Sequence, residues 1–452
     1  MRPGSAGRTP RGRRKGWIDR ALSLSAEVRP GEGPTALLLM LDMLILLMAY
    51  YIVKPVREAW ILGSLGAEVK AYAGAGQAAL FLLLLPLYDA MASRVSRIRL
   101  INGMTAFFIS NLVLFYFLAA AGANLGIVFF FWVGIFNLML VAQFWAFAND
   151  LYTEGQGKRL FAIVGVGSAL GAIIGAKAAG WLFEPVGPSN LMLVTAALLG
   201  VCMILTNWIH RRERTSTGDV VPKGGNGDRP LETQGAFELI HRHRYLMLIA
   251  AMVLMSNFVN TTGEFILGKA VTISAAQAVQ DPVNAGLTEE EYIGKFYADF
   301  FFWVNFITAI LQLFVVSRIM KRVGAAATLL LVPAISLGGY MLMAFLPMLT
   351  FVRTAKILEN SSNYSIQNTA RHALFLPTSR EAKYKAATAI ESFFWRIGDA
   401  CSALLVFVGT HLAFELTNYA LANVAAVIVW LLVVLAIVEL RRRQRSRTRI
   451  AA

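Results

Sequence analysis

Long apolar stretches recur along most of this chain, from residue 36 to residue 439. A stretch of about 20 apolar residues is long enough to cross the hydrocarbon core of a bilayer as an α-helix. Hydrocarbon offers no hydrogen-bond partners, so a spanning segment must satisfy its own backbone groups, as a helix does. We count twelve such stretches, near residues 36–62, 71–91, 101–121, 126–149, 160–182, 190–209, 245–269, 295–317, 326–347, 350–375, 384–411 and 417–439.

The composition excludes an ordinary soluble protein of several domains. Hydrophobic residues make up 57% of the chain and charged residues only 15%, whereas a soluble domain has about a quarter of its residues charged. The two cysteines, Cys202 and Cys401, lie inside apolar stretches, which argues against a disulfide scaffold or a cysteine-based metal site. We therefore expect an all-α integral membrane protein without a metal or another cofactor.

The basic residues indicate how the chain crosses the membrane. The net charge is +15, but its basic residues form separate clusters between apolar stretches, so they do not indicate a nucleic-acid-binding patch. Cytoplasmic connections of membrane proteins are enriched in Lys and Arg, and twelve spans place both ends on one side. The sequence thus predicts cytoplasmic termini. The basic clusters are residues 11–15, 94–99, 211–214, 318–322, 380–385 and 441–449.

The longest polar segment divides the chain into two halves. Residues 210–244 are polar and basic, and we interpret them as a cytoplasmic linker. KPVREAWIL at 54–62 aligns weakly with NTTGEFILG at 260–268, which pairs Glu58 with Glu264. Such repetition is typical of transporters with a site at the interface between the halves. The predicted units are a basic cytoplasmic tail without a cleavable leader (1–35), a six-helix bundle (36–209), the linker (210–244), a second six-helix bundle (245–440) and a basic tail (441–452).

Polar and ionisable residues inside the spans gather mainly in four of them. A charge near the bilayer centre costs about 3 kcal/mol even on lenient scales, so such residues need an interior partner or an aqueous cavity. We therefore expect them at a site between the halves. They are Lys54, Arg57 and Glu58 in the first span, Asn257, Asn260, Thr261, Thr262 and Glu264 in the seventh, a dense set in the tenth, and Glu391, Arg396 and Asp399 in the eleventh.

The tenth span carries the densest polar set, and we predict that it lines a water-filled path. Its polar residues recur at steps of three and four, which places them on one helix face. Glu359 and Tyr364 flank this stripe. Snorkelling of Arg353 and Arg371 from the two ends is the alternative for those two residues. The stripe consists of Arg353, Lys356, Asn360, Asn363, Gln367 and Arg371.

Two cations stand out as candidates for recognising an anion. Arg396 lies about twelve residues into its span, which is about 18 Å along a helix and close to the midplane; an internal ion pair with Asp399 is the alternative. Lys54 precedes Pro55, a combination suited to a helix that bends around a cavity. For Arg57 and Glu58, nearer the membrane surface, snorkelling is the alternative. Glu391, nearer the cytoplasm, could be a partner of Arg396 or a gate.

The fifth span contains glycines at regular spacing. Gly167, Gly171 and Gly175 are four residues apart, a step that lets two helices approach closely. A nucleotide-binding glycine loop would need a preceding strand and a Walker lysine. The spacing therefore predicts helix packing.

Three segments resemble a known family. FWAFANDLYTEGQGKRLFAIVGVGSALGAIIGA at 144–176 and LPTSREAKYKAATAIESFFWRIG at 376–398 resemble the ATP/ADP exchangers of plastids and intracellular bacteria, whose topology is major-facilitator-like. PLYDAMASRVSRIR at 86–99 is similar to a cytoplasmic motif of major facilitators. The resemblance implies a bacterial inner-membrane transporter of nucleotides and matches Lys54 to a substrate-binding lysine. The chain departs from the family at Gln156 and Asp399, where we expect an acidic residue and a lysine.

These observations predict a secondary transporter that exchanges nucleotides such as ATP and ADP, or similar anionic metabolites, by alternating access. The expected partners are a small anionic substrate and the lipid bilayer. The predicted substrate-binding residues are Lys54, Arg57, Asn149, Asn257, Asn260, Lys356, Asn360, Asn363, Tyr364 and Arg396. The predicted coupling or gating residues are Glu58, Asp89, Arg94, Glu264, Glu359, Glu391 and Asp399.

Two other functions compete with this prediction. One is proton-coupled transport of another solute, in which Glu264, Glu359 or Glu391 carries the proton, because a buried carboxylate can titrate near neutral pH. The other is an integral-membrane enzyme. We disfavour an enzyme because the chain has no acidic prenyl-diphosphate motif, no histidine cluster and no Ser/His/Asp grouping in its loops.

Overall fold

A computed structural model describes residues 16–22, 28–92, 95–152, 154–216, 236–284, 286–375, 378 and 386–450. Throughout these ranges the regular elements are helices, in agreement with the predicted all-α class. The gating residue Arg94 and the side chain of Asp89 lie outside what the structure describes.

The helices follow one another with short connections. The first six are α1 (Trp17–Leu22), α2 (Gly33–Ala92), α3 (Arg97–Ala120), α4 (Gly126–Leu151), α5 (Glu154–Val186) and α6 (Pro188–Ser216). The next group is α7 (Ala236–Arg242), α8 (Arg244–Gln280), η1 (Pro282–Asn284), α9 (Glu289–Ile310), η2 (Leu311–Val316), α10 (Ser317–Val323), α11 (Ala325–Thr328) and α12 (Leu331–Phe345). The last are α13 (Leu349–Ser362), η3 (Asn363–Gln367), α14 (Asn368–Leu374), α15 (Ala387–Ala389), η5 (Ile390–Phe394), α16 (Trp395–His411) and α17 (Leu416–Ile450).

Ten helices in the described part are long and apolar enough to cross a membrane, and the predicted count of twelve stays a prediction. One difference lies in α2, which contains both the first and the second predicted span. Gly66 interrupts this helix with φ 84° and ψ 174°, a conformation that glycine tolerates because it has no Cβ. The other difference is the tenth predicted span, which is helical over α13, η3 and α14 but is rich in polar residues.

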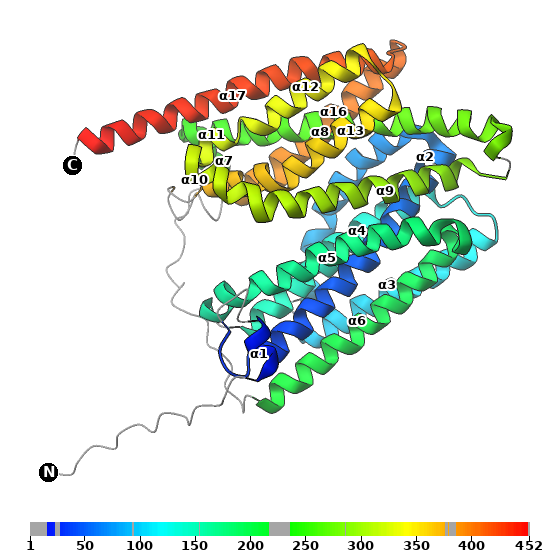
Figure 1. The fold of residues 1–452 in the computed structure, drawn as a ribbon, viewed down its shortest axis with the longest axis vertical. Helices are drawn as coiled ribbons and strands as arrows, with labels where there is room; N and C mark the ends of the chain where they lie inside the picture. Colours follow the sequence, from blue (N-terminus) through cyan, green and yellow to red (C-terminus); the bar gives the residue numbers. More distant parts are fainter. Residues whose placement is uncertain are drawn as a thin grey trace.

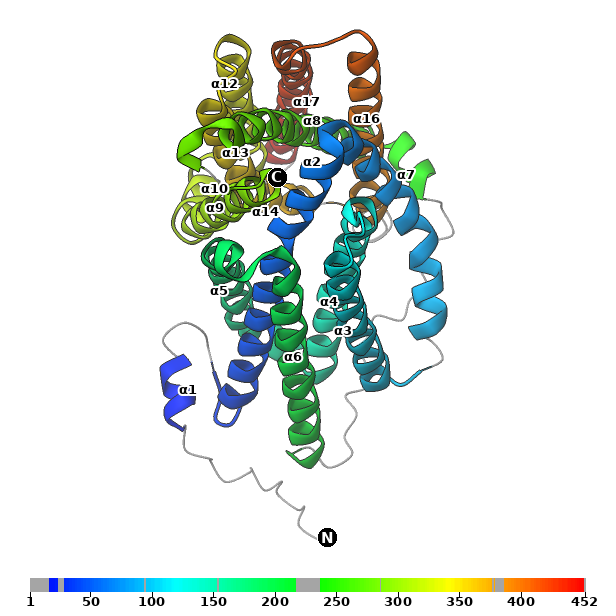
Figure 2. The same cartoon turned by 90° about the vertical axis from the view of Figure 1, so that its right-hand side faces the viewer.

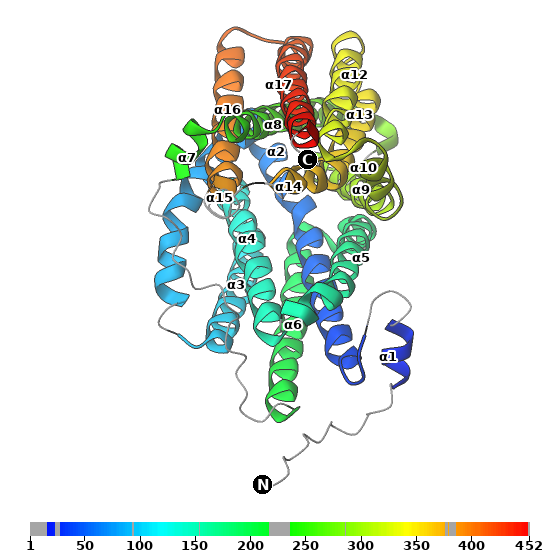
Figure 3. The same ribbon diagram turned by 90° about the vertical axis from the view of Figure 1, so that its left-hand side faces the viewer.

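The helices form two groups, which Figures 2 and 3 show one above the other. We call α2 to α6 the first half and α8 to α17 the second half. In Figure 1, α7 and the last turns of α17 lie at the left end of the bundle, where α8 also begins. We call this the basic end and the opposite end, where α2 turns at Gly66, the acidic end.

The glycines of α5 allow it to pack closely on α2. A Cβ built on Gly171 would lie 2.2 Å from the carbonyl oxygen of Leu44, and one on Gly167 would lie 2.2 Å from that of Met40. Only hydrogen fits there. The predicted role of these glycines in helix packing is confirmed.

The two halves contact each other through α5 and α9 and through α2 with α8, α9 and α16. At the acidic end, two ion pairs join them. Lys269 of α8 pairs with Glu68 of α2 at 2.9 Å, and Lys295 of α9 pairs with Glu184 of α5. The structure therefore has the halves joined at the acidic end.

Candidate substrate site between the two halves

Lys54 of α2 lies at the interface between the halves. Its side chain is buried, with the residue 9% exposed. The Nζ atom lies 3.9 Å from the ring centroid of Phe301 in α9 and 5.1 Å from that of Tyr51. An aromatic face attracts a cation by about 0.5–2 kcal/mol. The contact with Phe301 thus holds a first-half cation against the second half.

Arg57 and Glu58 form an internal charge cluster with a residue from the second arm of α2. Glu58 is buried, and its carboxylate pairs with the Arg57 guanidinium and, at 2.6 Å, with Lys70 Nζ. The guanidinium carbon of Arg57 also lies 4.9 Å from the ring centroid of Phe130 in α4. In this arrangement the charge of Arg57 is already matched by a carboxylate of its own helix.

Lys356 of α13 is completely buried, at 0% exposure, inside the second half. Its Nζ lies 2.9 Å from Glu359 Oε2 and 3.5 Å from Glu264 Oε1 of α8. It also donates to Asn260 Oδ1 at 3.2 Å. Two carboxylates therefore share one ammonium, and Lys356 can reach a substrate only if one of them releases it.

Polar neighbours complete this buried cluster. The hydroxyl of Tyr340, from α12, donates to Glu359 Oε2 at 2.8 Å, and Asn360 Nδ2 donates to Glu264 Oε1 at the same distance. A Cβ on Gly263 would lie 2.0 Å from the Tyr340 hydroxyl oxygen. Glycine at this position leaves the room that the cluster occupies.

Arg396 of α16 has both surroundings that the sequence left open. Its Nη1 lies 3.0 Å from Asp399 Oδ2, so the predicted internal ion pair is confirmed. Its guanidinium carbon also lies 5.0 Å from the ring centroid of Phe81 in the second arm of α2. With 32% of its side chain exposed, Arg396 faces the first half while it is paired.

Asp399 is held by the seventh predicted span. Asn257 Nδ2 donates to Asp399 Oδ1 at 2.7 Å, and Thr261 Oγ1 donates to the same oxygen at 2.9 Å. Both come from α8. These bonds fix the carboxylate and, through it, the position of Arg396.

The stripe predicted along the tenth span does not stay on one face. Lys356, Asn360 and Asn363 are buried, whereas Tyr364 is 46% exposed. Residues 363–367 form a π-helical turn, which inserts an extra residue and rotates the rest of the helix. A second π-helical turn, η5, directly precedes Arg396.

The remaining predicted residues lie nearer the basic end. Glu391 Oε1 lies 3.6 Å from Arg371 Nε and 3.3 Å from His372 Nδ1. Arg353, which we considered a snorkelling residue, pairs with Asp299 of α9. Asn149 is exposed near the end of α4.

One cation in this central region differs from the others. Of its five cations, only Lys54 has no carboxylate within 4 Å among the residues that the structure describes. Arg57, Lys70, Lys356 and Arg396 each have one, provided by Glu58, Glu264, Glu359 and Asp399. Lys54 is therefore the cation that is free to meet an added anion.

Sequence reasoning missed several polar residues of the membrane part. Lys70 was assigned to a connection, and Tyr340 was overlooked in an otherwise apolar span. Lys177 of α5, whose Nζ lies 4.9 Å from the ring centroid of Phe302, and Asp42 of α2 were also overlooked. A plain search for every ionisable residue inside the apolar stretches would have found the last two.

Comparisons with known proteins give a consistent result. The Major Facilitator Superfamily model matches residues 39–366. ADP,ATP carrier protein 1 of Chlamydia pneumoniae is 22% identical over 306 residues, which cover 60% of this chain and 57% of that protein. The Chlamydia muridarum protein of the same name is 24% identical over 334 residues, covering 65% of this chain and 61% of that protein. The chain thus spans about six tenths of these curated relatives.

Solved structures of transporters share the fold. A POT family transporter in complex with 5-aminolevulinic acid superposes with a TM-score of 0.62 at 12% sequence identity. The match covers 89% of this chain and 95% of that one. The identity is low, so the likeness concerns the fold alone.

Proposed function

This chain belongs to the Major Facilitator Superfamily, and from that premise we propose that it exchanges small anionic metabolites across a bacterial inner membrane, with ATP and ADP as the first candidates. The similarity to the chlamydial ADP,ATP carriers supports nucleotides as the substrate class. The polar cluster between the halves supports a site of the kind that alternating access requires.

The observation that carries this proposal is the unmatched charge of Lys54. A buried charge without a counter-ion costs several kcal/mol unless a partner offsets it. The aromatic rings around Lys54 offset part of this cost, and an anionic substrate offsets the rest. An empty site is then less stable than an occupied one, as an exchanger requires.

Arg396 supplies the second contact from the opposite half. In the structure it is paired with Asp399, so a bound anion competes with this carboxylate for the guanidinium. Asn257 and Thr261 keep Asp399 stabilised while Arg396 turns to the substrate. Binding from both halves links occupancy to their relative movement.

We assign the basic end to the cytoplasm, since Lys and Arg are enriched in cytoplasmic connections. The ion pairs of the acidic end then lie on the outer side of the membrane. In this orientation the structure corresponds to a state that is closed to the outside.

Proton-coupled transport of another solute is the second candidate. The observation that favours it is the buried group in which Glu264 and Glu359 share Lys356. With both carboxylates ionised, this group carries one excess negative charge, and a proton would remove it. Glu264 or Glu359 then carries the proton.

Exchange by purified protein in proteoliposomes tests the proposal. Vesicles loaded with ADP should take up labelled ATP, and empty vesicles should not. Lys54→Gln should reduce uptake about tenfold or more, because a charge-assisted contact contributes about 1.5–3 kcal/mol. Lys177→Gln is the matched control, since Lys177 is also an intramembrane lysine in contact with an aromatic ring.

Two outcomes would count against the proposal in different ways. Unchanged uptake by Lys54→Gln would remove Lys54 from the site. If nucleotides are not exchanged and do not raise the thermal stability of the wild type, the substrate class is wrong. A dependence on a pH gradient without counter-substrate would favour the proton-coupled alternative.

A further inference from the structure

Asp42 is a carboxylate buried in the interior of the first half. It belongs to α2 and is 2% exposed. It lies twelve residues before Lys54, about 18 Å along the helix, and is therefore well separated from the candidate substrate site. The ion pairs between described residues do not include Asp42.

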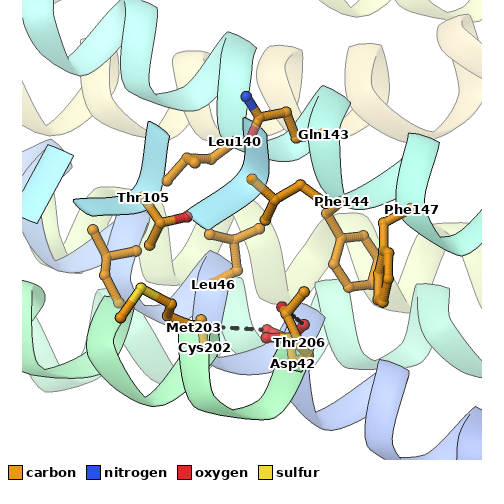
Figure 4. Close-up of a pocket in the computed structure, with 12 residues that line it drawn as sticks. Asp42, Leu46, Thr105, Leu140, Gln143, Phe144, Phe147, Cys202, Met203 and Thr206 are labelled. Carbon is orange, nitrogen blue, oxygen red and sulfur yellow. Dashed lines mark hydrogen bonds between the residues drawn. The ribbon is translucent and has the colours of Figure 1, made fainter. Parts of the chain in front are cut away.

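One hydroxyl is the direct hydrogen-bond partner of this carboxylate. Thr206 Oγ1 of α6 donates to Asp42 Oδ2 at 2.8 Å, and Figure 4 shows the two side chains together. The thiol of Cys202, also from α6, donates to the backbone carbonyl oxygen of Asp42 at 3.7 Å. Neither neighbour carries a positive charge.

Asp42 faces a small cavity between α2, α3, α4 and α6. The cavity has a volume of about 30 Å³, which is enough for a water molecule. Gln143 of α4 lines its opposite side and is 2% exposed, yet neither its Oε1 nor its Nε2 has a partner among the described residues. An orphaned buried amide beside a cavity indicates water that bonds to it.

The walls offer Asp42 no other ionised group. Among the residues that line the cavity, the Cys202 thiol is the one further titratable group. Nearer the basic end, α6 carries Glu213, which accepts a hydrogen bond from Thr35. Arg159 of α5, the helix packed on the other side of α2, pairs with Glu32. The other residues that line the cavity are Leu46, Ile101, Thr105, Leu140, Gln143, Phe144, Phe147, Leu199, Met203 and Thr206.

An ionised carboxylate in such a place is energetically expensive. Burial of a charge without a partner costs far more than one neutral hydrogen bond returns. The carboxyl group avoids this cost when it is neutral. A neutral carboxyl can accept from Thr206 through one oxygen and donate its own proton to cavity water through the other.

We propose that Asp42 is a proton-binding site of the first half, separate from the substrate site. A hydronium ion gives one proton to the carboxylate and becomes water; release is the reverse step. The cavity water, bonded to Gln143, connects Asp42 to the solvent when the helices of the first half part. Proton uptake removes the buried charge, so protonation favours the packed arrangement of α2 and α6 seen here.

Infrared spectroscopy of the reconstituted protein tests this proposal without any substrate. Wild type should show the carbonyl-stretch band of a protonated carboxyl group, which shifts in deuterium oxide and disappears as the pH is raised. Asp42→Asn should lack this band, and Asp281→Asn should keep it, because Asp281 is an exposed carboxylate at the acidic end. Thr206→Val should shift the band, since it removes the hydrogen bond to the carboxyl group.

Other results would overturn the inference. A titrating band that persists in Asp42→Asn would place the proton elsewhere. If the wild type shows only an ionised carboxylate, or if sodium ions remove the band at constant pH, Asp42 is not a proton site. Should Asp42→Asn fail to fold, the band shift in Thr206→Val decides, and an unshifted band contradicts the proposal.

Discussion

Lys54 and Arg396 are both cations at the interface between the halves, but their surroundings differ. Lys54 contacts aromatic rings, whereas Arg396 is paired with Asp399 and contacts Phe81. A cation with a carboxylate partner has two possible roles, because the pair can stabilise the protein or release the cation to a substrate. Substitution of both members of the pair separates these roles.

Arg396→Gln should lower the thermal stability of the purified protein. The substitution leaves Asp399 without its cation, which costs about 3–5 kcal/mol at a fully buried site and less here, because Arg396 is one-third exposed. Asp399→Asn in the same protein should restore the stability. If the pair is only structural, exchange should return as well.

The double variant should nevertheless remain inactive if Arg396 binds the substrate. Recovery of both stability and uptake by Arg396→Gln with Asp399→Asn would contradict a binding role. Anion recognition would then depend on Lys54 and on Lys356, once a carboxylate had released it.

At the scale of elements, the contact between α2 and α5 fixes the first half. It depends on glycines whose missing side chains leave room for the carbonyl oxygens of the opposite helix. The same contact carries Lys54 on α2 and Lys177 on α5. A shift of these helices would therefore move the candidate site.

Gly171→Ala should destabilise the protein by about 1–3 kcal/mol, the usual cost of overpacking. The new Cβ would meet the carbonyl oxygen of Leu44, which is backbone and cannot rotate away. Gly165→Ala in the same helix is the control, because no atom lies within 4 Å of a Cβ there. Thermal unfolding in detergent measures both; equal midpoints would contradict the packing argument.

Another contact ties the start of α2 to α5 at the basic end. Glu32 receives two hydrogen bonds from the Arg159 guanidinium, each 3.0 Å long. Burial alone would raise the pKa of Glu32. Hydrogen bonds from Arg159, from the backbone of Arg29 and from Gln156 outweigh burial, so the pKa lies below its ordinary value.

Glu32→Gln should therefore destabilise the protein in a pH-dependent way. A carboxyl whose pKa is lowered on folding contributes stability above its unfolded pKa, about 4.3 for Glu, and loses it as the pH falls through the lower folded value. The variant should unfold at a lower temperature than wild type at neutral pH. The two midpoints should converge in strong acid; a constant difference would contradict this role of the ionised carboxylate.

At the scale of the whole molecule, the ion pairs Lys269–Glu68 and Lys295–Glu184 join the halves at the acidic end. Partly exposed pairs of this kind contribute about 0–1 kcal/mol each. Such small energies suit a contact that must break in every cycle. Reversal of the charges should shift the balance between closed and open states.

Lys269→Glu with Lys295→Glu should open the acidic end. Labelling of Tyr364→Cys, in a background with Cys202→Ser and Cys401→Ser, reports the opening, because Tyr364 is exposed and acts electrostatically on Tyr51 of the first half. An impermeant thiol reagent outside the cell should react roughly fivefold faster after charge reversal, a shift of about 1 kcal/mol.

A matched control restores the pairs in reverse. Glu68→Lys and Glu184→Lys, added to the two reversed lysines, should return the labelling rate to its original value. An unchanged rate after charge reversal would show that these pairs do not hold the acidic end closed. Rapid labelling from outside before any charge reversal would contradict the proposed orientation.

The sequence by itself determined the elements of this protein. Apolar stretches about 20 residues long can satisfy their backbone only as helices in a membrane, and segment length and hydropathy are local properties. The spacing of Gly167, Gly171 and Gly175 predicted a close helix contact for the same reason, because three side chains on one helix face need no knowledge of the rest of the chain. The pairing of Arg396 with Asp399 was also within reach, since the two are three residues apart.

Only the tertiary structure decided which charges have partners. Lys54 meets Phe301, Glu264 meets Lys356, and Asp42 meets Thr206, and in each case the partner belongs to a helix distant in sequence. The π-helical turn at 363–367 moved Lys356 and Tyr364 into different surroundings, although the sequence placed them together. A side chain's partner depends on the crossing and rotation of whole helices, which arise from packing over their entire length. Hydropathy and spacing within one segment carry no information about them.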